Sequence, residues 1–215
     1  DYLGPLPTGQ KLPVYAFPFP VDDSALDPDG ELVRELRGKG FTTVIRLPFR
    51  QGIDRLAVEE DLLRNLQPRL LLFLPHVDHL ELAGTSGDFS SEVARDATSG
   101  VEEVLLETGD LTEDWLIYRG SVVPEPRVLE PLGEAWQAID QVRFAVAVPV
   151  DVDGHPRVGE NFPLHAYFPT DEQPGLHLAV HAEWMLSMDR RQIANAPEAV
   201  AFNRMLLRAV AKHLR

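Results

Sequence analysis

Cysteine is absent from this 215-residue chain. Its absence excludes a disulfide framework, a thiolate metal site and a cysteine nucleophile. The redox compartment therefore has no direct marker in the sequence, and the reducing cytoplasm is the default expectation.

Long apolar runs are missing as well. The longest, "LLLFLP" at 70–75, ends in proline, whereas a membrane-spanning helix needs roughly 20 apolar residues. The first twenty residues have neither the basic start nor the apolar middle of a secretory signal. We therefore expect no membrane anchor. Because the chain begins with Asp1 rather than Met, we expect it to start partway through a larger protein.

Basic charge is scarce relative to acidic charge. Twenty Lys and Arg residues stand against 34 Asp and Glu residues, so the formal net charge is -14. Nucleic-acid surfaces depend on many Lys and Arg side chains that neutralise phosphates. We therefore expect no nucleic-acid partner.

Several motifs that carry chemistry are also absent. The sequence holds no Walker-type phosphate loop, no Gly-x-Gly-x-x-Gly and no Gly-x-Ser-x-Gly elbow. His177 and His181 would share one face of a helix, but their segment alternates like a strand, which would place them about 13 Å apart. We therefore predict no metal site. The acid pairs Glu59–Glu60 and Glu102–Glu103 are interpreted as solvated surface.

What is present is an ordinary globular composition, with 44% hydrophobic and 25% charged residues. Apolar periodicity and turn residues predict strands in the middle of the chain and helices flanking them. The expected helices are 31–37, 53–66, 130–139 and 197–214, with a helical turn near 70–74. The expected extended segments are 12–19, 41–49, 77–82, 101–107, 114–123, 142–154, 162–170 and 176–186. The Ser-, Gly- and Asp-rich stretch 84–100 predicts a mobile hairpin or loop.

Two of these helices are predicted to bury an apolar face. In 53–66 the face consists of Ile53, Leu56, Leu62, Leu63 and Leu66. In 197–214 it consists of Phe202, Met205, Leu206, Ala209, Val210 and Leu214. The latter helix also carries Arg204, Arg208 and Lys212 at steps of four, which indicates either a solvated face or a contact with an acidic partner or another domain.

Adjacent arginines, Arg190 and Arg191, follow an apolar run near the end of the chain. In so acidic a protein such a pair serves either as a local counter-ion for a carboxylate or as a binding site for an anion such as phosphate. The counter-ion interpretation would pair them with Asp189, Glu183 or Glu198. From the residues alone both interpretations stay open.

Four segments, in order, carry a family resemblance: "KLPVYAFPFP", "FTTVIRLPFR", "LLLFLPHVDHLEL" and "FPLHAYFPTDEQPGLHLAVHAEWMLSMDRRQI". Together they resemble bacterial proteins with a sacsin-like ATP-binding region, relatives of the ninety-kilodalton heat-shock chaperone within the GHKL ATPase superfamily. The Glu/Asn helix, the Asp-x-Gly-x-Gly turn and the Gly-rich lid that bind ATP in that superfamily are not found in this sequence.

The resemblance implies two parts. Residues 1–50 would be the last strands of an ATP-binding domain, with Thr43 at the position that touches nucleotide, although Thr42 replaces the usual Gly there. Residues 51–215 would be a transducer or middle domain. Such domains are α+β, with a mostly antiparallel sheet backed by helices and a left-handed βαβ crossover.

The resemblance also implies a role for the arginines. Transducer domains send a basic residue to the terminal phosphate of ATP in the neighbouring domain, and Arg190 and Arg191 occupy the matching place. The implied function is to couple binding and hydrolysis of ATP, with Mg, in the preceding domain to conformational change. The chain alone would be catalytically silent.

The partners implied are the upstream nucleotide-binding domain, a protein client and a second copy in a homodimer. The alternative is a stand-alone protein-binding or scaffolding module without nucleotide dependence. A third hypothesis, a mismatch-repair or topoisomerase-type transducer acting with DNA, is disfavoured by the net charge of -14.

Overall fold

A computed structural model describes residues 30–43, 51–84, 87–97 and 100–214 of the chain. Backbone contacts divide the chain into two compact units, residues 1–53 and 54–215. We describe each unit by itself. The assignment of the first unit to an ATP-binding domain stays a prediction.

The described part of the first unit contains one helix, α1 (Gly30–Gly38), as the sequence predicted. The turn that follows is closed by backbone bonds from Lys39 and Gly40, and Lys39 also pairs with Glu35 at 2.6 Å. The extended segment expected at 12–19 lies outside the described residues. Of the strand expected at 41–49, only residues 41–43 are described, and they are not in a strand.

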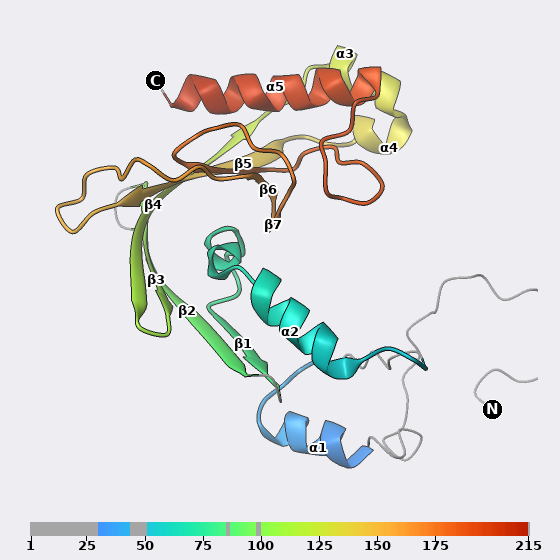
Figure 1. Cartoon of the computed structure of the whole chain (residues 1–215). Helices are drawn as coiled ribbons and strands as arrows, with labels where there is room; N and C mark the ends of the chain where they lie inside the picture. Colours follow the sequence, from blue (N-terminus) through green and yellow to red (C-terminus); the bar gives the residue numbers. More distant parts are fainter. Residues whose placement is uncertain (1–29, 44–50, 85–86, 98–99, 215) are drawn as a thin grey trace, which may run out of the picture. The chain divides into compact units, whose positions relative to one another are not determined.

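The second unit is built on an eight-stranded sheet with the strand order β1-β2-β3-β4-β5-β8-β6-β7, shown in Figure 1. All neighbouring strands are antiparallel except β6 and β8. The strands are β1 (His79–Ala83), β2 (Asp88–Asp96), β3 (Glu102–Thr108), β4 (Leu111–Val122), β5 (Val142–Val150), β6 (Leu164–Ala166), β7 (Phe168–Pro169) and β8 (Ala179–Ala182).

Helices in this unit are mostly short. They are α2 (Arg55–Asn65), the 3₁₀ helix η2 (Pro68–Phe73), α3 (Pro126–Leu129), η3 (Glu130–Leu132), α4 (Glu134–Gln137) and α5 (Pro197–His213). The single helix expected at 130–139 is thus divided, because Pro131 and Gly133 interrupt it. Within the described ranges, no helix has the length and apolarity that a bilayer crossing requires.

Helices and a mostly antiparallel sheet confirm the α+β class. The one parallel pair in the described sheet, β6 and β8, is connected through β7 and a loop rather than through a helix. A βαβ crossover is therefore not among the described strands.

The sheet has two faces with separate cores. We call the face that packs against η2 the inner face and the face that packs against α5 the outer face. In β5 the alternation is direct: Ala145 and Ala147 belong to the inner core, whereas Phe144 and Val146 belong to the outer core. Figure 1 shows α5 lying along β5 on one side of the sheet and η2 on the other.

Close packing at the centre of the sheet requires a glycine in β4. Gly120 is paired with Phe144 of β5, and a Cβ atom at Gly120 would lie 2.5 Å from Cζ of the buried Phe144 ring. The absence of a side chain at this position lets the ring cover β4.

α2 forms where the sequence predicted a helix, and Asp54 caps its first turn by accepting from the Leu56 N–H at 3.0 Å. Its predicted apolar face is wrong. Leu56 and Leu62 are about half exposed, whereas Glu59 in the middle of that face is buried. The reason is tertiary: Glu59 lies against the backbone of Gly84, where a Cβ would be 3.0 Å from its carboxylate, and Arg55 donates to it at 2.6 Å.

The stretch 84–100 was predicted as a hairpin or loop and contains β2, a nine-residue strand bonded on both sides. Its polar composition hides a two-residue alternation in which Ser91 and Val93 are buried. The Ser91 hydroxyl donates to the Glu107 carbonyl at 3.0 Å, so the buried polar atom is satisfied by the neighbouring strand.

Candidate functional site

Arg190 and Arg191 lie in a tight turn between Leu186 and Ile193, which form an isolated antiparallel bridge. Both arginines are exposed, and Met188 at the tip of the same turn is fully exposed. Arg190 has a φ of 59°, a left-handed conformation that costs a non-glycine residue about 1 kcal/mol.

Hydrogen bonds hold this turn from within. The Ser187 hydroxyl donates to Oδ1 of Asp189 at 2.6 Å, and the Arg191 backbone N–H donates to the same oxygen at 3.1 Å. These bonds, that from Ser187 first, keep the pKa of the Asp189 carboxyl below its ordinary value. The left-handed residue is therefore retained by a bonded frame around it.

Asn203 attaches the base of the turn to α5. This side chain is buried, accepts from the Met185 N–H at 2.9 Å and donates to the Met185 carbonyl at 2.9 Å. The turn thus extends from a rigid helix, and its arginines project from a fixed base.

The counter-ion for Arg191 is a residue that the sequence analysis did not name. Its guanidinium donates to Asp171 at 3.2 Å, and the two side chains are 70% and 45% exposed. Asp189 instead accepts from the Ser187 hydroxyl and the Arg191 backbone N–H, and Glu183 pairs with Arg143 at 2.8 Å. An exposed pair such as Arg191–Asp171 contributes about 0–1 kcal/mol, so it leaves the cation available.

Thr43, the predicted nucleotide contact, is exposed in the first unit and lies outside helix and strand. Its role stays a prediction, as do the roles of Arg190 and Arg191.

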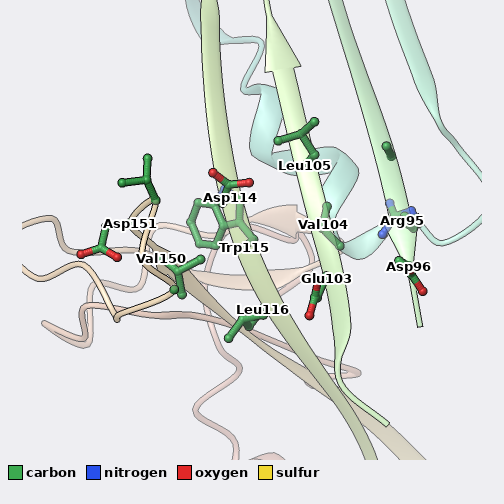
Figure 2. Close-up of a pocket in the computed structure, with 13 residues that line it drawn as sticks. Arg95, Asp96, Glu103, Val104, Leu105, Asp114, Trp115, Leu116, Val150 and Asp151 are labelled. Atoms are coloured by element: carbon green, nitrogen blue, oxygen red, sulfur yellow. The ribbon is translucent and has the colours of Figure 1, made fainter. Parts of the chain in front are cut away.

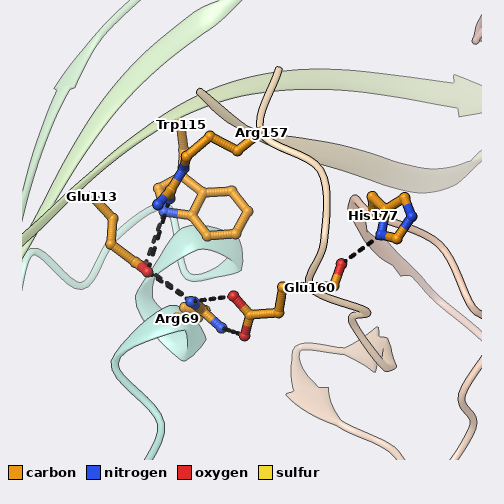
Figure 3. Close-up of polar contacts among 6 residues, drawn as sticks. All are labelled: Arg69, Glu113, Trp115, Arg157, Glu160 and His177. Carbon is orange, nitrogen blue, oxygen red and sulfur yellow. Dashed lines mark hydrogen bonds and ion pairs between the residues drawn. The ribbon is translucent and has the colours of Figure 1, made fainter. Parts of the chain in front are cut away.

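A second polar arrangement, which the sequence analysis missed, is centred on Arg69 of η2 (Figure 3). Its Nε and one terminal nitrogen donate to Glu113 of β4 at 3.0 and 2.6 Å. The guanidinium also donates to both carboxylate oxygens of Glu160, and it lies 5.0 Å from the Phe162 ring centroid. Three segments far apart in sequence are thereby joined.

Electrostatics favour this arrangement in its charged form. Burial opposes ionisation of Glu113, but the hydrogen bonds from Arg69 outweigh it and keep the pKa of the Glu113 carboxyl below its ordinary value. The hydrogen bond to Glu113 correspondingly raises the pKa of Arg69. Arg69 is therefore occupied structurally, and no motif spacing could have revealed partners 44 and 91 residues away.

Beside Arg69 lies a cavity of about 360 Å³, lined in part by Leu106, Phe162, Ala179 and His165. His165 is buried, and its Nδ1 atom has no hydrogen-bond partner among the described residues. Besides His165 and the Arg69 ion pairs, the polar residues Gln67, Thr108 and Asn161 also line the cavity.

His165 and His181 are directly paired across the parallel strands β6 and β8. Both rings pack against Phe73, at 4.8 and 5.4 Å between centroids. Burial lowers the pKa of each imidazole to about 4. Nδ1 of His181 lies 3.0 Å from the Tyr167 backbone nitrogen and 3.2 Å from the His165 carbonyl oxygen, so it can accept from the first or donate to the second.

Two of the acids interpreted as solvated surface are instead partnered. Besides Glu59, Glu102 has a side chain only 13% exposed and accepts from Arg95 at 2.9 Å and from Arg119 at 2.8 Å. The same arginines donate to backbone carbonyls of η2, at Leu71 and Leu72. Glu102 therefore orients the two cations that attach η2 to the sheet.

The turn after β5 brings Asp151, Asp153 and His155 together, which the sequence analysis did not predict. One ligand atom from each lies within 4.8 Å of the others, and all three residues are exposed. Oδ1 of Asp151 accepts from the backbone N–H groups of Asp153 and His155 at 3.0 and 2.8 Å. This carboxylate is accounted for by closing the turn.

A shallow hollow of about 520 Å³ lies against strands β2, β3 and β4 and the turn after β5 (Figure 2). Its acidic lining residues are Asp96, Glu103, Asp114 and Asp151, and its apolar ones include Leu105, Leu116 and Val150. Arg95 also lines it, but the guanidinium of Arg95 pairs with Glu102.

Comparison of the chain with family models, curated proteins and solved structures finds no match. What is established is therefore the α+β class and the geometry above.

Proposed function

We propose that this chain is part of a chaperone-related GHKL ATPase and that residues 51–215 act as its transducer region. In this proposal the region couples ATP binding and hydrolysis in a preceding domain to conformational change. The sequence resemblance suggests the family, and the geometry of the turn at Ser187–Gln192 is the observation that supports it best.

That turn has the properties that a phosphate-sensing element needs. Its backbone is fixed by Ser187, Asp189 and Asn203, so little backbone conformational entropy remains to be lost when the turn binds a ligand. Its two guanidinium groups are exposed, and among the described residues the ion pair that either makes with an acid is the exposed Arg191–Asp171 pair. A planar guanidinium binds phosphate oxygens in bidentate fashion and stays charged when desolvated.

The described residues fit ATP and Mg only in part. Arg190 and Arg191 suit the terminal phosphate, whereas the sequence holds no loop that would enclose the other phosphates or read adenine. The nucleotide and its metal would be held by the preceding domain, with Thr43 as one contact. The arginines would place positive charge beside the transferred phosphoryl group, where negative charge develops in the transition state.

The test is ATP turnover in the encoded protein with Arg190→Gly and Arg191→Ala combined. Glycine adopts the left-handed conformation of residue 190 without strain, so the turn is preserved. A cation that meets the terminal phosphate mainly in the transition state affects kcat more than nucleotide affinity, by on the order of a hundredfold. Unchanged turnover at equal folded fraction would remove both arginines from the mechanism.

An Arg191→Lys variant is the matched control. It keeps the charge and loses the planar fork, so partial turnover is expected if bidentate contact matters. If neither variant changes turnover, the protein-binding or scaffolding alternative replaces the transducer proposal.

A further inference from the structure

The outer face of the sheet is only half covered. α5 packs over β5 and contacts β4, and the outer core it forms continues to β8 and β6. In Figure 1 none of the described helices of this unit lies over the outer face of β1, β2 and β3. η2, which does contact these strands, lies on the inner face with Val93, Val104 and Leu106.

The uncovered half is rich in acidic side chains. Alternation along the strands puts the residues adjacent to the buried Val93, Val104 and Trp115 on this face. None of the positions that face outward on β1–β4 is Lys or Arg. The acids among them are Glu81, Asp88, Glu92, Asp96, Glu103, Glu107 and Asp114.

Strand register places acids directly opposite acids. Glu92 faces Glu107, and Asp96 faces Glu103, across the β2–β3 ladder. Directly opposed like charges destabilise a sheet, so the pairing of Glu92 with Glu107 opposes the stability of the fold. A face selected only for folding or solubility would alternate the signs.

Between the two acid pairs lies an apolar floor. Ala94 faces Leu105, and Leu105 faces Asp114. Leu105, Leu116 and Val150 line the hollow in Figure 2, together with Asp96, Glu103 and Asp114. The face therefore offers both negative charge and apolar contact, which is the complement of a cationic amphipathic segment.

We infer that the outer face of β1, β2 and β3, together with Asp114 and Leu116 of β4, is a docking surface for a Lys- or Arg-rich amphipathic segment of a partner protein. The acid pairs are four residues apart along each strand, about 13 Å. Cations eight residues apart on a helix are separated by about 12 Å, so a helix with Arg at every fourth position can meet both pairs. This surface is separate from the Arg190–Arg191 turn, so the inference does not depend on the proposed function.

The test measures binding of the 215-residue chain to a 20-residue peptide of Ala and Leu with Arg at every fourth position, in low and moderate salt. The sheet variant combines Glu92→Gln, Glu103→Gln and Glu107→Gln. The control variant combines Glu60→Gln, Glu130→Gln and Asp140→Asn, three exposed acids on other elements. Both variants lose the same net charge.

The sheet variant should bind the peptide at least about tenfold more weakly, because each pair with a cation contributes a few tenths to 1 kcal/mol. The control should stay within about twofold of wild type, and added salt should weaken wild-type binding. The sheet variant should also unfold at an equal or higher temperature, by up to about 4 °C, because like-charge repulsion is removed. Weaker binding then cannot be attributed to unfolding.

Three results would overturn the inference. They are no binding by wild type, equal loss in the sheet and control variants, and self-association of wild type that disappears with Arg204→Glu and Arg208→Glu. The last result would assign the face to α5 of a second copy.

Discussion

The buried pair His165–His181 should make the fold sensitive to mild acid. Both rings are packed against Phe73, and burial holds the pKa of each near 4, compared with an ordinary value of 6.5. Charging either ring in the folded state would place an imidazolium in the inner core beside the other.

The direction follows from proton linkage. Between pH 6.5 and pH 4 the unfolded chain binds protons at these two sites and the folded chain does not, so the free energy of unfolding falls as pH falls. Each histidine has a folded pKa of about 4. Its titration should therefore lower the free energy of unfolding by about 2 kcal/mol between pH 7 and pH 5. The two histidines together should lower the free energy of unfolding by about 4 kcal/mol over the same range.

The assay is urea unfolding at pH 7 and pH 5, followed by tryptophan fluorescence. His165→Phe removes one titrating ring at a position where Nδ1 has no partner, so the loss between the two pH values should be about halved. His76→Gln, at an exposed position, is the matched control and should keep the full loss.

The carboxylates of Glu102 and Glu113 do not interfere in this window. The pKa values of Glu102 and Glu113 are lowered from 4.5, so the stability they contribute is lost only as pH falls below that range. Equal pH dependence in wild type and His165→Phe would refute the reasoning, since it would mean that His165 binds a proton without cost in the folded state.

Further predictions concern packing, ion pairs and nucleotide. Arg69→Ala should cost about 2–3 kcal/mol in urea unfolding, because it leaves the half-buried Glu113 carboxylate without its main partner. Arg127→Ala, which breaks an ion pair in which Arg127 is 81% exposed, should cost under about 1 kcal/mol, and equal costs would contradict the analysis of Arg69. Gly120→Ala should lower the melting temperature by several degrees, because its Cβ would collide with Phe144; an unchanged temperature would show that the ring moves freely. The 215-residue chain should show no ATP binding by calorimetry, since it lacks adenine-reading and phosphate-enclosing motifs; a micromolar dissociation constant would contradict this.

Local sequence signals were sufficient where an element is stabilised by its own periodicity. α5 begins at Pro197 and buries Phe202 and Leu206, as the apolar spacing predicted. β5 was equally clear, because the run from Val142 alternates and ends in an Asp-Gly turn, and the strand spans Val142–Val150.

The candidate sites were predicted only as residue types. The adjacency of Arg190 and Arg191 suggested an anion-binding site. The folded chain alone shows the left-handed φ of Arg190, the ion pair of Arg191 with Asp171 and the attachment of the turn to Asn203. No sequence spacing indicates such contacts.

The sequence by itself determined the α+β class, most of the helices and strands, and the acidic balance, because propensity, periodicity and charge are local or additive properties. Tertiary structure decided which side of α2 is buried and which acids are partnered, because burial depends on what lies opposite. Glu59 is buried because Gly84 leaves room for it, and Glu102 is partnered because Arg95 and Arg119 reach it from neighbouring strands. The register that opposes Glu92 to Glu107 is likewise a property of strand pairing, which no single strand specifies.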